Sequence, residues 1–139
     1  MNPGKQDLDR EILKLLKEDS RRSNVSIAGE LGISEGLVRQ RIGRMREDGT
    51  IRKFSIETSS RGLKAIMEMN IEVNVHTTQI AEKIRALPGV EKVYETSGVT
   101  DIIAFLDVDD TAMLNDTIEA IRALGPITNT RTKLVLGEL

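Results

Sequence analysis

The stretch VSIAGELGISEGLVRQRI, residues 25–42, decides the fold of the amino-terminal half. Two short segments with helical apolar spacing lie on either side of Gly32–Ser34, and glycine permits a tight turn between two helices. Ala28 is small enough for two helices to cross closely, and Val38 returns apolar packing from the second helix. This pattern predicts a helix-turn-helix, in which the second helix is held against the major groove of DNA.

The predicted second helix carries side chains suited to DNA. Arginine pairs with guanine through two hydrogen bonds and glutamine pairs with adenine, while further cations can lie along phosphates. The expected DNA-binding residues are Ser34, Glu35, Gly36, Arg39, Gln40, Arg41, Arg44, Arg46, Arg52 and Lys53. Two residues fit less well, because Glu35 repels phosphate unless it accepts from cytosine and Gly43 weakens a helix. The alternative is a small three-helix domain whose arginines form a solvated face.

Further elements are expected around this motif. Asp7 is the expected cap of a preceding helix, Ser26 that of the second helix and Ser34 that of the third, which stops at Gly49. Residues 50–57, TIRKFSIE, alternate and predict a strand or a small wing. The inner face of the first helix repeats at helical spacing through Leu8, Ile12, Leu15 and Leu16.

The apolar period then changes from helical to alternating. Residues 58–64, TSSRGLK, are small, polar and contain glycine, so they predict a linker between a domain at 1–57 and a domain at 65–139. The second domain has the order strand, helix, strand, strand, helix, strand, which predicts a ferredoxin-like antiparallel sheet and an α+β fold. Its first strand alternates through Met67, Met69, Ile71, Val73 and Val75.

The strand DIIAFLDV, residues 101–108, is apolar on both faces. Two helices cover only one face of a four-stranded sheet, so the other face is expected to pack on a second subunit. The sequence therefore predicts a homodimer built through the carboxy-terminal half. Leu134 and Leu136 are expected to be core residues of the last strand.

Composition limits the other possibilities. The 139 residues are 39% apolar and 30% charged, and the chain has one histidine and no cysteine. It has no apolar segment long enough to span a membrane, and its amino terminus is polar and charged, unlike a secretory signal. We therefore expect a soluble cytoplasmic protein. Residues 1–60 carry a net charge of +2 and residues 61–139 a net charge of −4, which places a polyanion partner with the first half. Residues 107–110, DVDD, predict a strand end and a helix cap at Asp109 or Asp110, and no metal site is expected.

The segment LDREILKLLKEDSRRSNVSIAGELGISEGLVRQRIGRMREDGTIRKF, joined to a βαββαβ domain, closely resembles the Lrp/AsnC family, also called feast/famine regulators. The resemblance covers residues 6–137 and includes the motifs PGV and TSGVTDII and the segment TRTKLVL. It implies a prokaryotic transcription factor that dimerises, often assembles into octamers or other higher oligomers, and in many members binds an amino acid.

The resemblance also implies an effector site. In the family a Gly-x-x-Asp loop lines a site between dimers, together with the threonine-rich start of the last strand. The matching residues are Gly98, Val99, Thr100, Asp101, Thr130 and Thr132, with Thr128 beside them. Asp101 could accept from an α-ammonium or from backbone N–H groups that shape the loop. Val99 and Thr100 stand where many members have an acidic and an aromatic residue, so the resemblance leaves the effector identity open. Gly36 and Leu37 stand where small hydroxyl residues are common in the family, so the operator sequence is also left open.

Three function classes follow. The leading hypothesis is a sequence-specific DNA-binding regulator modulated by a small amino-acid effector, with no other cofactor. The alternative is an effector-independent architectural DNA-binding protein in which SGVTD is only a turn. An enzyme is not expected, because the sequence offers no nucleophile–base pair, metal cluster or glycine-rich phosphate loop.

Overall fold

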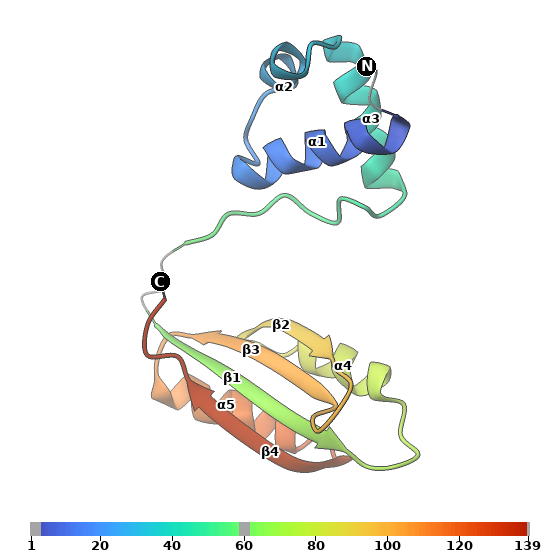
Figure 1. The fold of residues 1–139 in the computed structure, drawn as a ribbon. Coiled ribbons are helices and arrows are strands. Elements are labelled where there is room, and N and C mark those ends of the chain that lie inside the picture. The colour runs from blue at the N-terminus through green and yellow to red at the C-terminus, as the bar shows by residue number, and fades with distance from the viewer. Residues whose placement is uncertain (1–3, 59–61, 139) are drawn as a thin grey trace. The chain divides into compact units, whose positions relative to one another are not determined.

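The computed structural model describes residues 4–58 and 62–138, which divide into two compact units, Met1–Thr58 and Ser59–Leu139 (Figure 1). The predicted linker, residues 58–64, partly lies outside the described residues, because 59–61 are not among them. The first strand of the second unit, β1, begins at Leu63. The last two residues of the predicted linker therefore belong to the sheet.

The first unit consists of three helices around one apolar core. They are α1 (Lys5–Glu18), α2 (Asn24–Leu31) and α3 (Glu35–Glu47). Gly32 ends α2 in the left-handed conformation, with φ of 65°, and so permits the predicted turn before α3. The core is formed by the buried side chains of Leu8, Ile12, Leu15, Leu16, Ile27, Ala28, Val38 and Met45. The predicted helix-turn-helix is confirmed.

Of the three helix caps predicted in the first unit, two are wrong and one is confirmed. Helix α1 begins at Lys5 after Gly4, so Asp7 lies inside its first turn, where a carboxylate favours the positive end of the helix dipole. Ser23, not Ser26, caps α2, because the Ser23 hydroxyl accepts from the Ser26 backbone N–H at 3.1 Å. Ser34 caps α3 as predicted and accepts from the Leu37 N–H at 3.2 Å.

The predicted strand or wing at residues 50–57 is not formed within the described chain. Ile51 N–H donates to the Met45 carbonyl at 2.7 Å and closes the end of α3. Beyond it, no strand is assigned through residue 58. A strand needs a neighbour for its backbone groups, and none of the described strands pairs with this segment. Phe54 and Ile56 are consequently exposed.

The second unit is a four-stranded antiparallel sheet with two helices. Its elements are β1 (Leu63–Ile71), α4 (Thr77–Arg85), β2 (Val90–Glu95), β3 (Ile102–Val108), α5 (Thr111–Arg122) and β4 (Ile127–Leu134). The strand order is β2-β3-β1-β4. This arrangement confirms the predicted βαββαβ order, the ferredoxin-like topology and the α+β class. The Asp110 carboxylate caps α5 by accepting from Met113 N–H at 2.9 Å.

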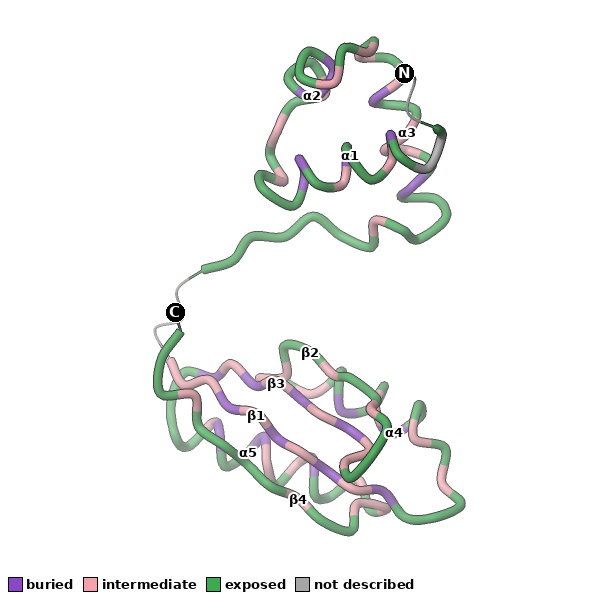
Figure 2. The backbone as a smooth tube through the Cα atoms, in the orientation of Figure 1, coloured by how far each residue is buried: buried purple, intermediate pink, exposed green. Residues whose placement is uncertain are grey.

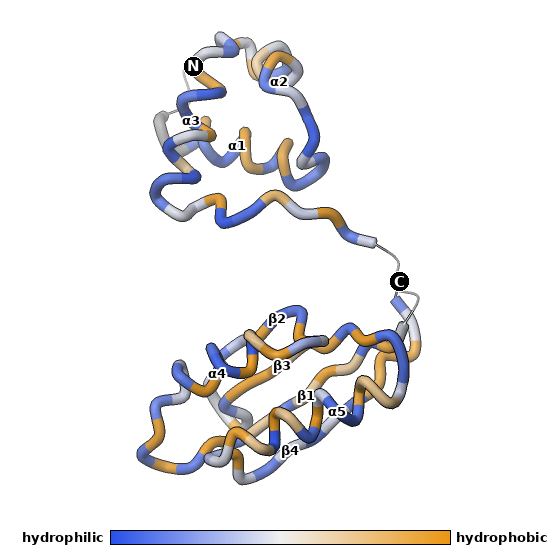
Figure 3. Tube along the Cα trace, turned by 180° about the vertical axis from the view of Figure 1, so that it is seen from behind, coloured by the Kyte–Doolittle hydropathy of each residue, from blue (hydrophilic) through white to orange (hydrophobic). Residues whose placement is uncertain are grey.

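Burial alternates along the two central strands (Figure 2). One face packs against α4 and α5, and Figure 3 shows that β1 and β3 are the most apolar strands. The strand residues that are buried on the helix-covered face are Ala65, Met67, Met69, Ile71, Ile102, Ala104, Leu106 and Val108. The opposite face, here called the open face, carries the half-buried Ile66, Ile103 and Phe105 and the exposed Tyr94. Tyr94 and Phe105 stack edge to face, with ring centroids 5.7 Å apart.

Three residues expected on the apolar faces are exposed, and a fourth, Val75, lies beyond β1 but packs against the core of the unit. Strand β1 ends at Ile71, and Val73 is 88% exposed because the chain turns through Asn74, whose φ is 80°. Val75 is half-buried beyond this turn. Leu134 and Leu136 are exposed, since β4 is an edge strand that ends at Leu134. Alternation in the sequence predicts the side on which a residue lies but not whether another element covers it.

Candidate DNA interface and effector loop

The outer face of α3 is open to solvent. Gly36, Arg39, Gln40 and Gly43 lie at helical spacing opposite the buried Val38, and the Arg39 side chain is 70% exposed. A Cβ atom built on Gly36 or Gly43 would meet nothing within 4 Å. This face of α3 therefore presents one guanidinium and one carboxamide between two glycines that have no side chains, an arrangement that suits contact with base edges.

Arg39 has a partner in the structure. Its guanidinium pairs with the Glu35 carboxylate one turn earlier on α3. An exposed pair at this spacing contributes only about 0.5 kcal/mol. Glu35 can thus orient Arg39 without preventing it from exchanging its partner for a guanine.

Ser34 caps α3, in addition to its predicted role in DNA binding. Its hydroxyl oxygen accepts from Leu37 N–H, and it is exposed at the amino-terminal end of α3. The hydroxyl proton remains a potential donor, and helix amino termini favour phosphate. Capping and phosphate contact are therefore compatible at this residue.

The predicted phosphate-binding cations fall into two groups. Arg44, Arg46, Arg52 and Lys53 are exposed, as contact with phosphate requires. Arg41 differs, since its side chain is 11% exposed and its Nη1 donates to Asp9 Oδ1 of α1 at 3.2 Å. Arg41 therefore joins α3 to α1 and leaves little of its side chain accessible to phosphate. Sequence spacing missed this pairing because Asp9 lies 32 residues earlier.

The predicted effector loop is a tight connection between β2 and β3. Thr96 N–H donates to the Asp101 carbonyl at 2.9 Å, and the Thr96 hydroxyl donates to the Thr100 carbonyl at 2.6 Å. Gly98 has φ of 112°, a conformation that favours glycine. The Val99 side chain is 92% exposed. The loop thus presents Gly98 and Val99 outward on a hydrogen-bonded base.

The Asp101 carboxylate holds this loop against β1. Its Oδ2 accepts from the Ile71 backbone N–H at 2.9 Å and from Asn70 Nδ2 at 3.3 Å, and Asn70 Nδ2 also donates to the Val99 carbonyl at 2.6 Å. Among the described residues no donor reaches Oδ1. Of the two predicted roles for Asp101, shaping the loop is therefore observed, and one carboxylate oxygen remains available.

Of the predicted threonines of β4, Thr128 is connected to the loop through β1. The Thr128 hydroxyl donates to the Asn70 carbonyl at 3.3 Å, at the point where the β1–β4 pairing is irregular. Thr130 and Thr132 pair with Met69 and Met67, so both lie on the helix-covered side of the sheet. Asn70 therefore connects the loop to Thr128, while Thr130 and Thr132 lie farther along β4.

Two residues of this region escaped the sequence analysis. Asn70 contacts both the loop and, through its carbonyl, Thr128. Arg122, in the last turn of α5, donates to the Thr130 hydroxyl at 3.3–3.4 Å and pairs with Glu119. Nothing local in the sequence indicates either contact, because Asn70 is one of several polar residues that alternate along β1 and the Arg122 partner Thr130 lies on another element.

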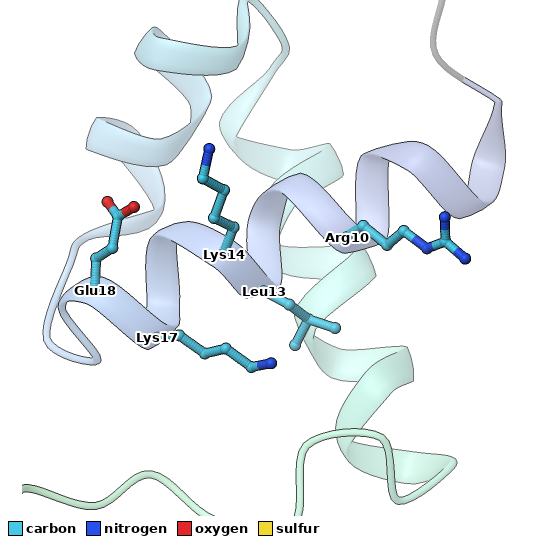
Figure 4. Close-up of a pocket in the computed structure, with 5 residues that line it drawn as sticks. All are labelled: Arg10, Leu13, Lys14, Lys17 and Glu18. Atoms are coloured by element: carbon cyan, nitrogen blue, oxygen red, sulfur yellow. The ribbon is translucent and has the colours of Figure 1, made fainter.

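A separate hollow of about 380 Å³ lies on α1 and coincides with no predicted site (Figure 4). Leu13 is its only apolar lining residue, and Lys17 extends beside it. Its lining residues are Arg10, Leu13, Lys14, Lys17 and Glu18. Such a basic, shallow surface is typical of a solvated helix face.

Other kinds of site find no support in the part of the chain that the structure describes. Across residues 4–58 and 62–138, no three side chains of the metal-ligating types form a group. His76 is exposed and precedes α4 without a side-chain cap. Among the described helices none has the length and apolar character needed to cross a membrane.

Each of the two units matches a known protein family. Residues 5–52 match the winged helix-turn-helix DNA-binding family, and residues 64–139 match the Lrp/AsnC ligand binding domain. The second match covers more than half of the chain. The chain belongs to the Lrp/AsnC family. It is therefore an Lrp/AsnC-type DNA-binding transcriptional regulator that contains a ligand-binding domain.

Individual Lrp/AsnC proteins match over almost the whole chain. The transcriptional regulator LysM of Saccharolobus solfataricus is 34% identical over 92% of this chain and 91% of its own. The regulator FL11 of Pyrococcus furiosus is 26% identical over 94% and 88%, respectively. Both are named as transcriptional regulators, which agrees with the prediction that the chain is not an enzyme.

Solved structures show the same fold. The leucine response regulatory protein of Mycobacterium tuberculosis superposes with a TM-score of 0.82 at 20% identity, covering 95% of this chain and 92% of that one. AsnC of E. coli superposes with a TM-score of 0.73 at 23% identity, covering 94% of this chain and 91% of that one. A transcriptional regulator of Neisseria meningitidis in complex with L-Met superposes with a TM-score of 0.78 at 20% identity, covering 95% of this chain and 90% of that one.

Proposed function

We propose that this Lrp/AsnC protein recognises specific DNA sequences through α3 and that a small amino-acid effector in the second unit modulates its affinity. The observation that carries the proposal is the exposed stripe on α3, where Arg39 and Gln40 stand between two glycines that leave room for base edges. Arg44, Arg46, Arg52 and Lys53 supply phosphate contacts, and Ser34 a helix-end contact.

The effector site is assigned to the loop between β2 and β3 and the start of β4. Asp101 Oδ1 would accept from the effector's α-ammonium, and the loop around Gly98 allows backbone groups to approach its carboxylate. Thr130 and Thr132 would contribute hydroxyls, and Val99 would contact the effector side chain. The L-Met complex of the Neisseria meningitidis regulator, which shares the fold, supports an amino acid as the class of ligand.

The chain would act as a homodimer through the open face of its sheet. Ile66 lies opposite Phe105 across β1 and β3, and Tyr94 packs on Phe105, which leaves an apolar patch on this face. Glu68 beside it pairs with Lys133 at 2.6 Å and with Arg131 at 3.7 Å, and the Lys133 hydrogen bond lowers the pKa of Glu68. A two-fold axis would bury the apolar patch against itself. Assembly of dimers into octamers or other higher oligomers would place effector loops near one another.

The effector component is tested by thermal shift across the standard amino acids. An effector that binds only the folded protein raises the melting temperature, and the same compound should change affinity for promoter DNA in fluorescence anisotropy. Thr132→Val removes an exposed hydroxyl for which the structure describes no partner, so it should reduce the shift without lowering the melting temperature of the unliganded protein. Thr111→Val makes the same change at an exposed threonine at the start of α5, outside the loop and β4, and is the matched control.

One observation favours the second candidate, an effector-independent architectural DNA-binding protein. The Asp101 carboxylate already has hydrogen-bond partners on β1, so a structural turn accounts for its position without a ligand. If no amino acid shifts the melting temperature or changes DNA affinity, the architectural function replaces the effector-regulated one.

A further inference from the structure

Asp9 is an acidic residue that faces the recognition helix from α1. Its side chain is 17% exposed, and its two oxygens contact two different arginines of α3. Oδ1 accepts from Arg41 Nη1 at 3.2 Å, and Oδ2 accepts from Arg44 Nη2 at 3.4 Å. One carboxylate therefore links α1 to two arginines that lie three residues apart on one side of α3.

The two contacts differ in their surroundings. Arg41 is 11% exposed, so its charge is largely removed from water and needs an acidic partner nearby. Arg44 is 52% exposed and can reach solvent or phosphate while still close to Asp9. The Arg41 contact is thus suited to fix the position of α3, and the Arg44 contact to restrain a cation at the DNA surface.

We propose that Asp9 is a positioning residue for DNA recognition, which anchors α3 through Arg41 and restrains Arg44 from binding phosphate indiscriminately. The proposal rests on α3 being the recognition helix. Non-specific affinity depends on the number of cations that neutralise phosphates, whereas specificity depends on how the base-contacting side chains are placed. A carboxylate that holds the helix and occupies one cation favours specific over non-specific binding.

The test compares Asp9→Asn with Glu11→Gln by fluorescence anisotropy over a series of salt concentrations. Glu11 is an exposed acid of α1 for which the structure describes no ion-pair partner, so its substitution makes the same charge change without touching α3. The probes are a duplex selected by the native protein from a random pool and a shuffled duplex of the same composition. Circular dichroism confirms that each variant is folded.

We expect Asp9→Asn to steepen the slope of log affinity against log salt by up to about 0.9, the value of one full phosphate contact, because Arg44 contributes only part of such a contact while Asp9 restrains it. Binding to the shuffled duplex should strengthen up to about fivefold at 0.1 M salt. Discrimination between the duplexes should fall. Adding Arg44→Gln should restore the slope. The proposal is overturned if Glu11→Gln has the same effects, if Asp9→Asn changes neither slope nor discrimination, or if it weakens both duplexes equally.

A second comparison holds even if Asp9→Asn does not fold. In the native background Arg44→Gln should reduce the salt slope by less than Arg46→Gln, because Arg46 is exposed and the structure describes no acidic partner for it. Equal reductions would contradict the restraint by Asp9. Arg39→Ala tests separately whether α3 is the recognition helix. If Arg39→Ala loses sequence preference while the Asp9 variants show no effect, α3 is still the recognition helix and only the positioning role of Asp9 is overturned.

Discussion

At the scale of single residues, Asp101 and Asn70 show how a predicted ligand residue can also hold the fold. The carboxylate accepts from the Ile71 backbone and from Asn70, and Asn70 in turn holds the Val99 carbonyl. The family pattern predicted Gly98 and Asp101 from the sequence. Asn70, Arg122 and Asp9 could not be predicted, because their partners lie elsewhere along the chain and only folding brings them together.

The first prediction concerns the stability of this loop. Asp101→Ala should lower the free energy of unfolding by about 1–3 kcal/mol, because it leaves the Ile71 N–H and the Asn70 amide without their acceptor. Urea denaturation measures the change. Asp109→Ala, at an exposed acid in the same unit, should change stability little. Equal effects of the two substitutions would show that Asp101 does not hold the loop.

At the scale of elements, apolar periodicity predicted all of the helices and the strands of the sheet. It failed where tertiary neighbours decide the outcome. The segment 50–57 alternates like a strand but has no partner among the described strands, and Leu134 alternates like a core residue but lies on an edge. The cap of α2 was misplaced because Ser23 and Ser26 are equally suitable residue types, and only the hydrogen bond between them distinguishes their roles.

The second prediction concerns α3. Gly43→Ala should raise the free energy of unfolding by about 1 kcal/mol, since alanine favours a helix interior more than glycine does. Space permits the change, because a Cβ at Gly43 meets nothing within 4 Å. Thermal unfolding measures it. Gly32→Ala is the contrasting variant and should destabilise, because Gly32 has a positive φ. A destabilising Gly43→Ala would contradict the open space around a Cβ atom at this position.

At the scale of the whole molecule, the family and both units agree on a regulator with one DNA-binding and one ligand-binding part. The sequence predicted this division from the change in apolar period. It also predicted a dimer from the apolar character of both faces of β3, and the structure describes on the open face a cluster of Ile66, Ile103, Phe105 and Tyr94 that fits this proposal.

The third prediction concerns this proposed dimer. Phe105→Glu should convert the dimer to monomer at micromolar concentration, because it places a charge in the centre of the apolar patch. Sedimentation velocity measures the mass. Val73→Glu introduces the same charge in an exposed turn away from the sheet and should leave the dimer intact. A dimer that persists in Phe105→Glu would assign the interface to another surface.

The central claim is that the outer stripe of α3 selects the DNA sequence, and one measurement tests it most directly. The native protein and Arg39→Ala are each used to select duplexes from a random pool, and the enriched sequences are compared. Lys53→Ala, at an exposed cation beyond α3, is the control. We expect Arg39→Ala to lose the preference for guanine at one position per half-site, about 1–3 kcal/mol of discrimination, while Lys53→Ala keeps every preference and only weakens binding. Identical preferences for the native protein and Arg39→Ala would contradict the claim.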